Sequence, residues 1–172
     1  PWLRERIKQL GKPRLGGVHR ETPQEPAVLV APIPYKRIAI ALDFSRNVEK
    51  LLSESLRFTD KSQTHVILLH VVESPVARTI GAESEDLETQ TDRQRLEQLA
   101  DTLTKAGVSV EWRLGTGDPV SELSKMINEL QVEMVVVGSH GHTGVSDLIH
   151  GTVISNLRHH IKASVVIIPI GT

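Results

Sequence analysis

The chain has 172 residues, of which 39% are hydrophobic, 24% charged and 3% aromatic, and its formal net charge is −1. This composition fits one soluble globular domain with some length left over. The lack of cysteine excludes a disulfide scaffold, a thiol nucleophile and a cysteine-based zinc site. The small net charge argues against nucleic-acid binding, and no apolar run reaches the roughly 18 residues that span a bilayer.

Residues 1–35 are predicted to form a basic arm or linker, followed by one domain over residues 36–172. Six of the nine prolines lie in the first 36 residues, together with seven basic and three acidic side chains, a net charge of +4. Apolar residues from Trp2 to Leu10 can line one side of a short helix, a pattern of segments at membrane surfaces. A solvated tail is the simpler alternative. Because the chain opens on Pro1 and not on methionine, we expect a fragment or a processed chain.

From Arg37 onward, short apolar runs alternate with amphipathic stretches. The runs predict strands over 38–42, 66–72, 108–114, 134–137 and 165–170, and apolar residues at 3.6-residue spacing predict helices over 48–56, 96–106, 120–130 and 154–161. Strict alternation of this kind predicts an α/β fold with a parallel, doubly wound sheet. The third run alternates apolar and polar residues, which indicates an edge strand.

Local signals refine these elements. Asp118 followed by Pro119 is a helix N-cap with a favoured first helical residue, and Gly151 with Thr152 opens the last helix. Residues 74–86 are polar and irregular, which predicts a mobile flap over one end of the sheet. The charged run 84–95 is interpreted as a solvated helix face, and His159 and His160 are expected on the exposed side of the last helix.

The candidate ligand site lies beyond the carboxyl ends of the strands, where ligands of open parallel sheets bind. Glycines at 138, 141 and 144 leave backbone amides free to surround an anion. Gly151 and Thr152 add a hydroxyl and free amides at a helix N-terminus, which favours phosphate. The alternatives are that the glycines serve tight turns and that Asp43 caps the helix near residue 48.

Four segments in order resemble the universal stress protein family. Residues 138–152 fit the spacing G-x2-G-x9-G-(S/T) of its ATP-binding members, and residues 37–45 (RIAIALDFS), 65–73 (HVILLHVVE) and 115–119 (GTGDP) resemble its first strand, second strand and the loop before its third helix. The likeness extends over residues 36–170. It implies a Rossmann-like fold of the adenine nucleotide alpha hydrolase type, with five strands in the order 3-2-1-4-5.

The resemblance also implies a site for ATP, ADP or AMP. Ala41 and Asp43 would flank ribose and adenine, with the Asp43 carboxylate accepting from ribose hydroxyls, and the Val71 backbone would meet the adenine edge. The residues that would hold the phosphates are Gly138, His140, Gly141, Gly151, Thr152 and Val153. His142 stands where the family often has arginine, and His150 where many members have an aliphatic residue, so affinity or phosphate preference is expected to differ from the family norm.

A metal site built by protein side chains is not predicted. His140, His142 and His150 are close in sequence, but a glycine loop does not fix their geometry and no carboxylate sits at a firm ligand spacing. Mg²⁺ accompanying a nucleotide is the favoured metal, because it usually keeps its waters and relies on phosphates.

The leading functional hypothesis is a cytoplasmic, non-catalytic module whose output is adenine-nucleotide binding. No nucleophile and base are paired at a recognisable spacing and no P-loop is present, which leaves at most weak ATP hydrolysis. The competing hypothesis is a nucleotide-free interaction scaffold. The family resemblance suggests a homodimer through the last strand, Ser164 to Ile170, and the arm suggests a module tethered to the membrane as part of a fused transporter.

Overall fold

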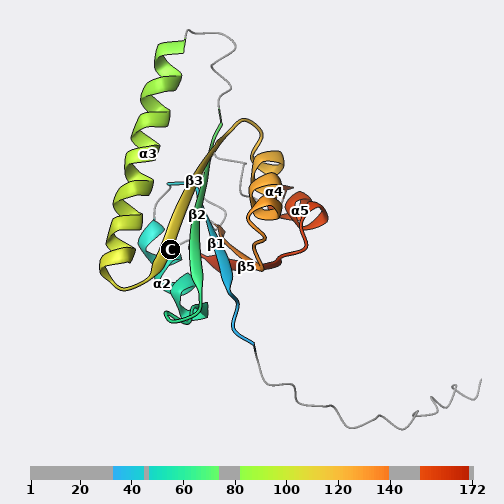
Figure 1. Ribbon diagram of the computed structural model, residues 1–172. Coiled ribbons are helices and arrows are strands. Elements are labelled where there is room, and N and C mark those ends of the chain that lie inside the picture. Colours follow the sequence, from blue (N-terminus) through green and yellow to red (C-terminus); the bar gives the residue numbers. More distant parts are fainter. Residues whose placement is uncertain (1–32, 45–46, 74–81, 140–151, 171–172) are drawn as a thin grey trace, which may run out of the picture. The chain divides into compact units, whose positions relative to one another are not determined.

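A five-stranded parallel sheet forms the centre of the computed structural model, which describes residues 33–44, 47–73, 82–139 and 152–170 (Figure 1). The strands lie in the order β3-β2-β1-β4-β5, and all neighbouring pairs are parallel. The elements are β1 (Arg37–Leu42), α2 (Val48–Ser55), a 3-10 helix (Leu56–Phe58), β2 (His65–Val72), α3 (Ala82–Lys105), β3 (Ser109–Thr116), α4 (Pro119–Glu129), β4 (Met134–Ser139), α5 (Thr152–His160) and β5 (Ser164–Pro169). The predicted fold class, strand order and edge position of β3 are confirmed.

Helices cover both faces of the sheet. Alternate residues of a strand point to opposite faces, so Ile38 and Ile40 of β1 pack with α2 and α3, whereas Ala39 packs with α4 and α5. Figure 1 shows α2 and α3 on one side of the strands and α4 and α5 on the other. The core is aliphatic, with Leu51, Leu96, Ile127 and Leu157 among the helix residues that are almost fully inaccessible to solvent.

Two predictions about the chain between β2 and β3 need correction. Residues 82–86, expected to be irregular, form the first turn of α3. The run 84–95 is not a uniformly solvated face, because Asp92 is buried with 7% of its surface exposed. Residues 74–81 lie outside the described residues, as do residues 1–32, so the flap and the arm stay predictions. None of the described helices is long and apolar enough to cross a membrane.

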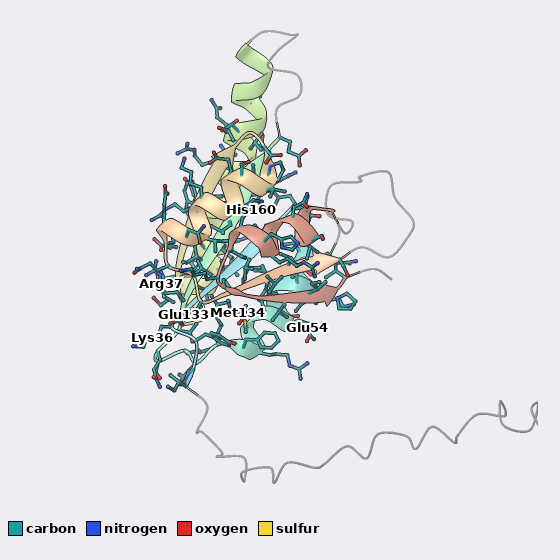
Figure 2. The ribbon with its side chains drawn as sticks, turned by 90° about the vertical axis from the view of Figure 1, so that its right-hand side faces the viewer. Lys36, Arg37, Glu54, Glu133, Met134 and His160 are labelled. Carbon is teal, nitrogen blue, oxygen red and sulfur yellow. The ribbon has the colours of Figure 1, made fainter. Side chains whose placement is uncertain are left out.

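The amino ends of β1 and β4 are tied together by Glu133, the residue before β4. Its carboxylate accepts hydrogen bonds from the backbone N–H of Lys36 at 2.5 Å and of Arg37 at 3.4 Å. Its own N–H donates to the Arg37 carbonyl at 3.0 Å. Figure 2 shows Lys36, Arg37, Glu133 and Met134 close together. These contacts fix the register in which Ile38 pairs with Met134.

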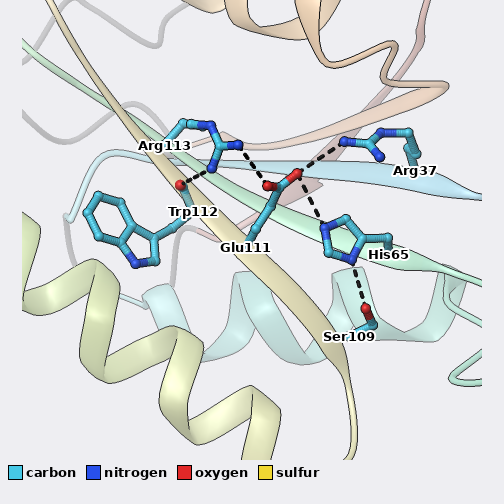
Figure 3. A network of polar contacts seen from close by, with 6 residues as sticks. All are labelled: Arg37, His65, Ser109, Glu111, Trp112 and Arg113. Atoms are coloured by element: carbon cyan, nitrogen blue, oxygen red, sulfur yellow. Dashed lines mark hydrogen bonds and ion pairs between the residues drawn. The ribbon is translucent and has the colours of Figure 1, made fainter.

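A charged network fixes the amino end of the edge strand β3 (Figure 3). The Glu111 carboxylate lies 3.0 Å from Arg37, 2.8 Å from Arg113 and 3.3 Å from His65 Nε2. His65 Nδ1 lies 2.7 Å from the Ser109 hydroxyl. The network joins β1, β2 and β3 at the end of the sheet opposite to the carboxyl ends of the strands.

Candidate ligand-binding cavity

A cavity of about 690 Å³ lies at the carboxyl ends of β1, β2 and β4. The strand order reverses here, because β1 has β2 on one side and β4 on the other. Open α/β sheets bind ligands at such a point, and the volume falls in the range of small-molecule sites, roughly 300 to 1,000 Å³. The helices α3, α4 and α5 supply the remaining walls that the structure describes.

Most of the predicted site residues that the structure describes lie around this cavity. Those that line it are Ala41, Asp43, Val71, Gly138 and Val153. Thr152 is the first residue of α5, as predicted. His140, Gly141 and Gly151 lie outside the described residues. The structure therefore brings together the residues expected around ribose and adenine and leaves most of the predicted phosphate loop undescribed.

The described walls combine apolar side chains with an excess of carboxylates. Leu123 of α4 and Ile154 and Leu157 of α5 supply apolar surface. The charged lining residues are Asp43, Glu73, Asp92 and Arg95. Because Asp92 and Arg95 pair with each other, the carboxylates of Asp43 and Glu73 give this part of the cavity its acceptor character, which suits a ligand that presents hydrogen-bond donors, such as hydroxyl or amino groups.

Glu73 follows β2 and lies at the rim of the cavity. Burial raises the pKa of Glu73 above its ordinary value of 4.5, and repulsion by the Asp118 carboxylate adds to the rise, while His70 opposes it. The end of β2 therefore combines partial burial with two neighbouring carboxylates, those of Glu73 and Asp118.

Asp118 is the N-cap of α4, as the sequence predicts. Its side chain accepts a hydrogen bond of 2.9 Å from the backbone N–H of Ser121, and Pro119 is the first helical residue. The cap fixes the position at which α4 begins and so places Pro119 and Leu123 in the cavity wall. Hydrogen bonds from Ser121 lower the pKa of Asp118 below its ordinary value of 3.8.

Replacing Asp118 by alanine is expected to lower the free energy of unfolding by about 1 kcal/mol near neutral pH. Because the folded-state pKa lies below the unfolded-state pKa, the ionised carboxylate stabilises the fold above pH 3.8 and loses this effect as pH falls through the lowered value. Urea denaturation at several pH values tests this. The difference in unfolding free energy between the unaltered protein and Asp118→Ala should shrink below pH 3.8. Asp118→Asn, which keeps the cap, is the control; equal losses in both variants would contradict the capping role.

A network of polar side chains, which was not predicted from the sequence, lies on the α3 side of the cavity. His70 of β2 lies with Nδ1 2.8 Å from the Leu42 carbonyl and Nε2 3.1 Å from Asp92 Oδ2. Arg95 Nη1 lies 3.2 Å from Asp92 Oδ1. Asp92 precedes Leu96 by four residues, so it falls on the same helix face as the predicted apolar stripe. That spacing was the signal that could have placed Asp92 against the sheet.

Gly138 is closely packed against the core and also lines the cavity. A Cβ at this position would lie 2.5 Å from Ile170 Cδ1 and 3.2 Å from its Cγ1. Ile170 is 2% exposed and belongs to the core cluster with Leu51. The missing side chain therefore allows the end of β4 to approach the residue that follows β5, a reason that the sequence analysis did not give.

No metal centre is evident in the part of the chain that the structure describes. Within those residues, no three histidine, aspartate or glutamate side chains are grouped so that they could hold a metal ion. His140, His142 and His150 lie outside the described residues.

The fold and the cavity define a doubly wound α/β domain with a cavity at the switch point of its sheet. Residues 34–169 match the model of the universal stress protein family, and the chain belongs to this family.

Three solved structures illustrate the likeness. Universal stress protein MJ0577 of Methanocaldococcus jannaschii is 24% identical over 144 residues, 73% of this chain and 89% of the relative. Its structure has a TM-score of 0.69 at 25% identity and covers 80% of this chain and 97% of that chain. The structure of a universal stress protein in complex with cAMP has a TM-score of 0.57 at 19% identity. The match covers 80% of this chain and 98% of that chain. The structure of the universal stress protein from Archaeoglobus fulgidus in complex with dAMP has a TM-score of 0.54 at 19% identity. The match covers 79% of this chain and 99% of that chain.

Proposed function

We propose that this domain binds an adenine nucleotide in the cavity at the carboxyl ends of β1, β2 and β4 and that binding regulates the interactions of the protein. The observation that carries the proposal is that Ala41, Asp43, Val71, Gly138 and Val153 all line one cavity of suitable volume. Structures of two family members are complexes with cAMP and dAMP, which supports an adenine nucleotide as the ligand class.

The chemistry of the described walls suits the nucleoside part of such a ligand. The Asp43 carboxylate is an acceptor for ribose hydroxyls, Ala41 offers a small apolar surface beside ribose and adenine, and the Val71 backbone can meet the adenine edge. The phosphates are assigned to the backbone near Gly138, to the amides at the start of α5 and to His140, Gly141 and Gly151, as the family resemblance implies. Mg²⁺ would enter with the nucleotide and would be held mainly by its phosphates.

The proposed output is regulatory, with at most weak ATP hydrolysis. The P-loop pattern G-x4-G-K-(S/T) is absent from the sequence, and slow hydrolysis would need only water aligned with the bound phosphates. The basic, proline-rich residues 1–35 favour a domain that lies in the cytoplasm and is tethered to a membrane transporter. A full-length open reading frame that encodes no transmembrane helices would reject this tether.

A homodimer through β5 is part of the proposal. β5 is the last strand of the sheet, and Ile167 is 49% exposed. An apolar edge strand can pair with a second copy of itself. This surface is also the feature that favours the competing scaffold function.

Nucleotide titration is the test of the proposed function. ATP, ADP or AMP at 100 times its dissociation constant is expected to stabilise the fold by about 2.7 kcal/mol, which a thermal shift detects. Asp43→Ala is expected to weaken binding about tenfold in isothermal titration calorimetry, because a charged acceptor for the ribose is lost. Asp101→Ala, an exposed site on α3, is the matched control.

Absence of any shift with all three nucleotides would reject the proposal. Light scattering on the same samples measures self-association. A stable dimer that does not bind nucleotide would favour the competing function of an interaction scaffold.

A further inference from the structure

Phe44, directly after Asp43, is half-buried and contacts residues from two other elements. Its ring centroid lies 4.5 Å from that of His70 in β2, with the rings tilted by 54°. The Arg95 guanidinium carbon of α3 lies 5.4 Å from the same ring centroid. Phe44, His70 and Arg95 all line the cavity. The turn that presents Asp43 is therefore packed between β2 and α3.

The backbone of Phe44 requires this support. Its φ angle is +51°, in the left-handed region that non-glycine residues avoid because the side chain crowds the backbone. A large residue keeps such a conformation only where surrounding contacts favour it over the alternatives. In this turn the contacts are an aromatic contact with His70 and a cation–π contact with Arg95.

One carboxylate holds both supporting residues. Asp92 is 7% exposed, and its two oxygens are used on opposite sides, Oδ2 toward His70 at 3.1 Å and Oδ1 toward Arg95 at 3.2 Å. The other nitrogen of His70 donates to the carbonyl of Leu42, the last residue of β1. A continuous set of contacts therefore runs from α3 through Asp92 and His70 to the backbone that precedes Asp43.

We propose that Asp92 is a positioning residue for the nucleotide site: by holding His70 and Arg95 against Phe44 it keeps the turn in its left-handed form and the Asp43 carboxylate in place for the ligand. This inference rests on the nucleotide binding proposed above. It assigns no direct ligand contact to Asp92, which acts through Phe44.

Removal of the Asp92 carboxylate and its replacement by an amide should have different effects on nucleotide affinity. Asp92→Ala leaves Nε2 of His70 and the Arg95 guanidinium without this partner, so we expect the dissociation constant for ATP or AMP to rise about fivefold. In Asp92→Asn, the introduced oxygen can accept from Arg95, and the introduced nitrogen can donate to His70 Nε2 when the ring carries its proton on Nδ1, toward the Leu42 carbonyl. We therefore expect Asp92→Asn to bind nucleotide nearly as well as the unaltered protein.

A matched control separates positioning from stability. Leu96 lies one turn along the same face of α3, is 0% exposed and does not line the cavity. Leu96→Ala is expected to lower the melting temperature without changing nucleotide affinity, measured by calorimetry well below the melting transition. If Asp92→Ala likewise lowers only the melting temperature, Asp92 is structural and the inference is wrong.

A double-mutant cycle tests whether Asp92 acts through Phe44. Glycine adopts a φ of +51° without strain, so in the Phe44→Gly background there is no side chain for Asp92 to hold through its partners. Asp92→Ala should then cause a clearly smaller loss of affinity, because the contact of His70 with the Leu42 carbonyl is the route to Asp43 that remains. An undiminished loss in that background would overturn the inference. Failure of the unaltered protein to bind any nucleotide would instead reject the proposed function itself.

A measurement without ligand distinguishes failure of the positioning role from failure of the proposed nucleotide binding. The NMR coupling between the amide and α protons of Phe44 reports its φ angle. We expect the value for the left-handed form in the unaltered protein and in Asp92→Asn, and a changed value in Asp92→Ala. An unchanged coupling in Asp92→Ala would overturn the positioning role whatever the nucleotide result.

Discussion

Leu157→Ala is expected to lower the free energy of unfolding by about 2 to 5 kcal/mol, the usual cost of removing a buried leucine side chain. Leu157 is 0% exposed and packs with Ile127 of α4 and Val137 of β4. Of the α5 side chains that the structure describes, it is the one classed as buried, while the others are half-buried or exposed. The attachment of α5 to the sheet therefore depends heavily on this residue.

Urea denaturation measures the loss, and Asn156→Ala is the matched control. Asn156 is the exposed neighbour of Leu157 on α5, and its replacement should change the unfolding free energy by no more than about 0.5 kcal/mol. A loss below about 1 kcal/mol in Leu157→Ala would show that the site collapses around the smaller side chain and that α5 is held by other contacts.

The role of Leu157 also links stability to the site. Leu157 lines the cavity together with Ile154 and Val153, which precede it on α5. The first residues of α5 are those assigned to the phosphates, so the packing that holds the helix also sets the position of its amino end. Stability and ligand binding are expected to be coupled at this helix and much less at α2, whose residues do not line the cavity.

The three central strands, β1, β2 and β4, could be predicted from the sequence because they are largely buried on both faces. The run 66–72 is apolar apart from His70, and β2 extends only one residue further, to His65. The edge strand β3 continues to Thr116, two residues beyond its predicted end, because backbone pairing with Val71 and Val72 prolongs it where its own apolar alternation stops. A pattern of side chains does not contain that pairing.

The first half of α3 illustrates the opposite case. Residues 84–95 are almost entirely polar, so no apolar stripe marks them, although their glutamate, glutamine and leucine residues favour a helix. The helix begins at Ala82, and its polar residue Asp92 is buried by contact with His70, 22 residues earlier. Such a contact depends on how α3 packs on β2, which neither residue reveals by itself.

The candidate site could be predicted where it depends on topology. Asp43, Val71 and Gly138 lie at or just after the ends of strands, and parallel strands bring those ends to one edge. Phe44, Asp92 and Arg95 were missed because their importance comes from one another: a strained backbone, a shared carboxylate and a guanidinium over a ring. These interactions appear only when three elements are placed together.

Gly138 shows how a correct residue can be predicted for an incomplete reason. The expected role was open backbone for an anion, whereas the structure adds a packing requirement, because a Cβ would lie 2.5 Å from Ile170 Cδ1. The backbone of Ile170 is fixed by a hydrogen bond from its N–H to the Ser139 carbonyl at 2.9 Å and by one from the Asn47 side chain to its own carbonyl at 2.7 Å. The Ile170 backbone therefore has little freedom to move away, so relief of the clash requires the Ile170 side chain to rotate within the core.

Gly138→Ala is accordingly expected to destabilise the domain by about 1 to 3 kcal/mol, the cost of an added carbon in a packed core. Ile170→Val deletes Cδ1, the atom that the new Cβ would meet, and by itself should cost about 0.5 to 1.5 kcal/mol. Because the two changes relieve each other, the double variant should be more stable than the sum of the single losses predicts, by at least about 0.5 kcal/mol. Urea denaturation of the four proteins measures this coupling. Strict additivity would show that Ile170 rotates out of the way, and the case for Gly138 would then return to ligand access alone.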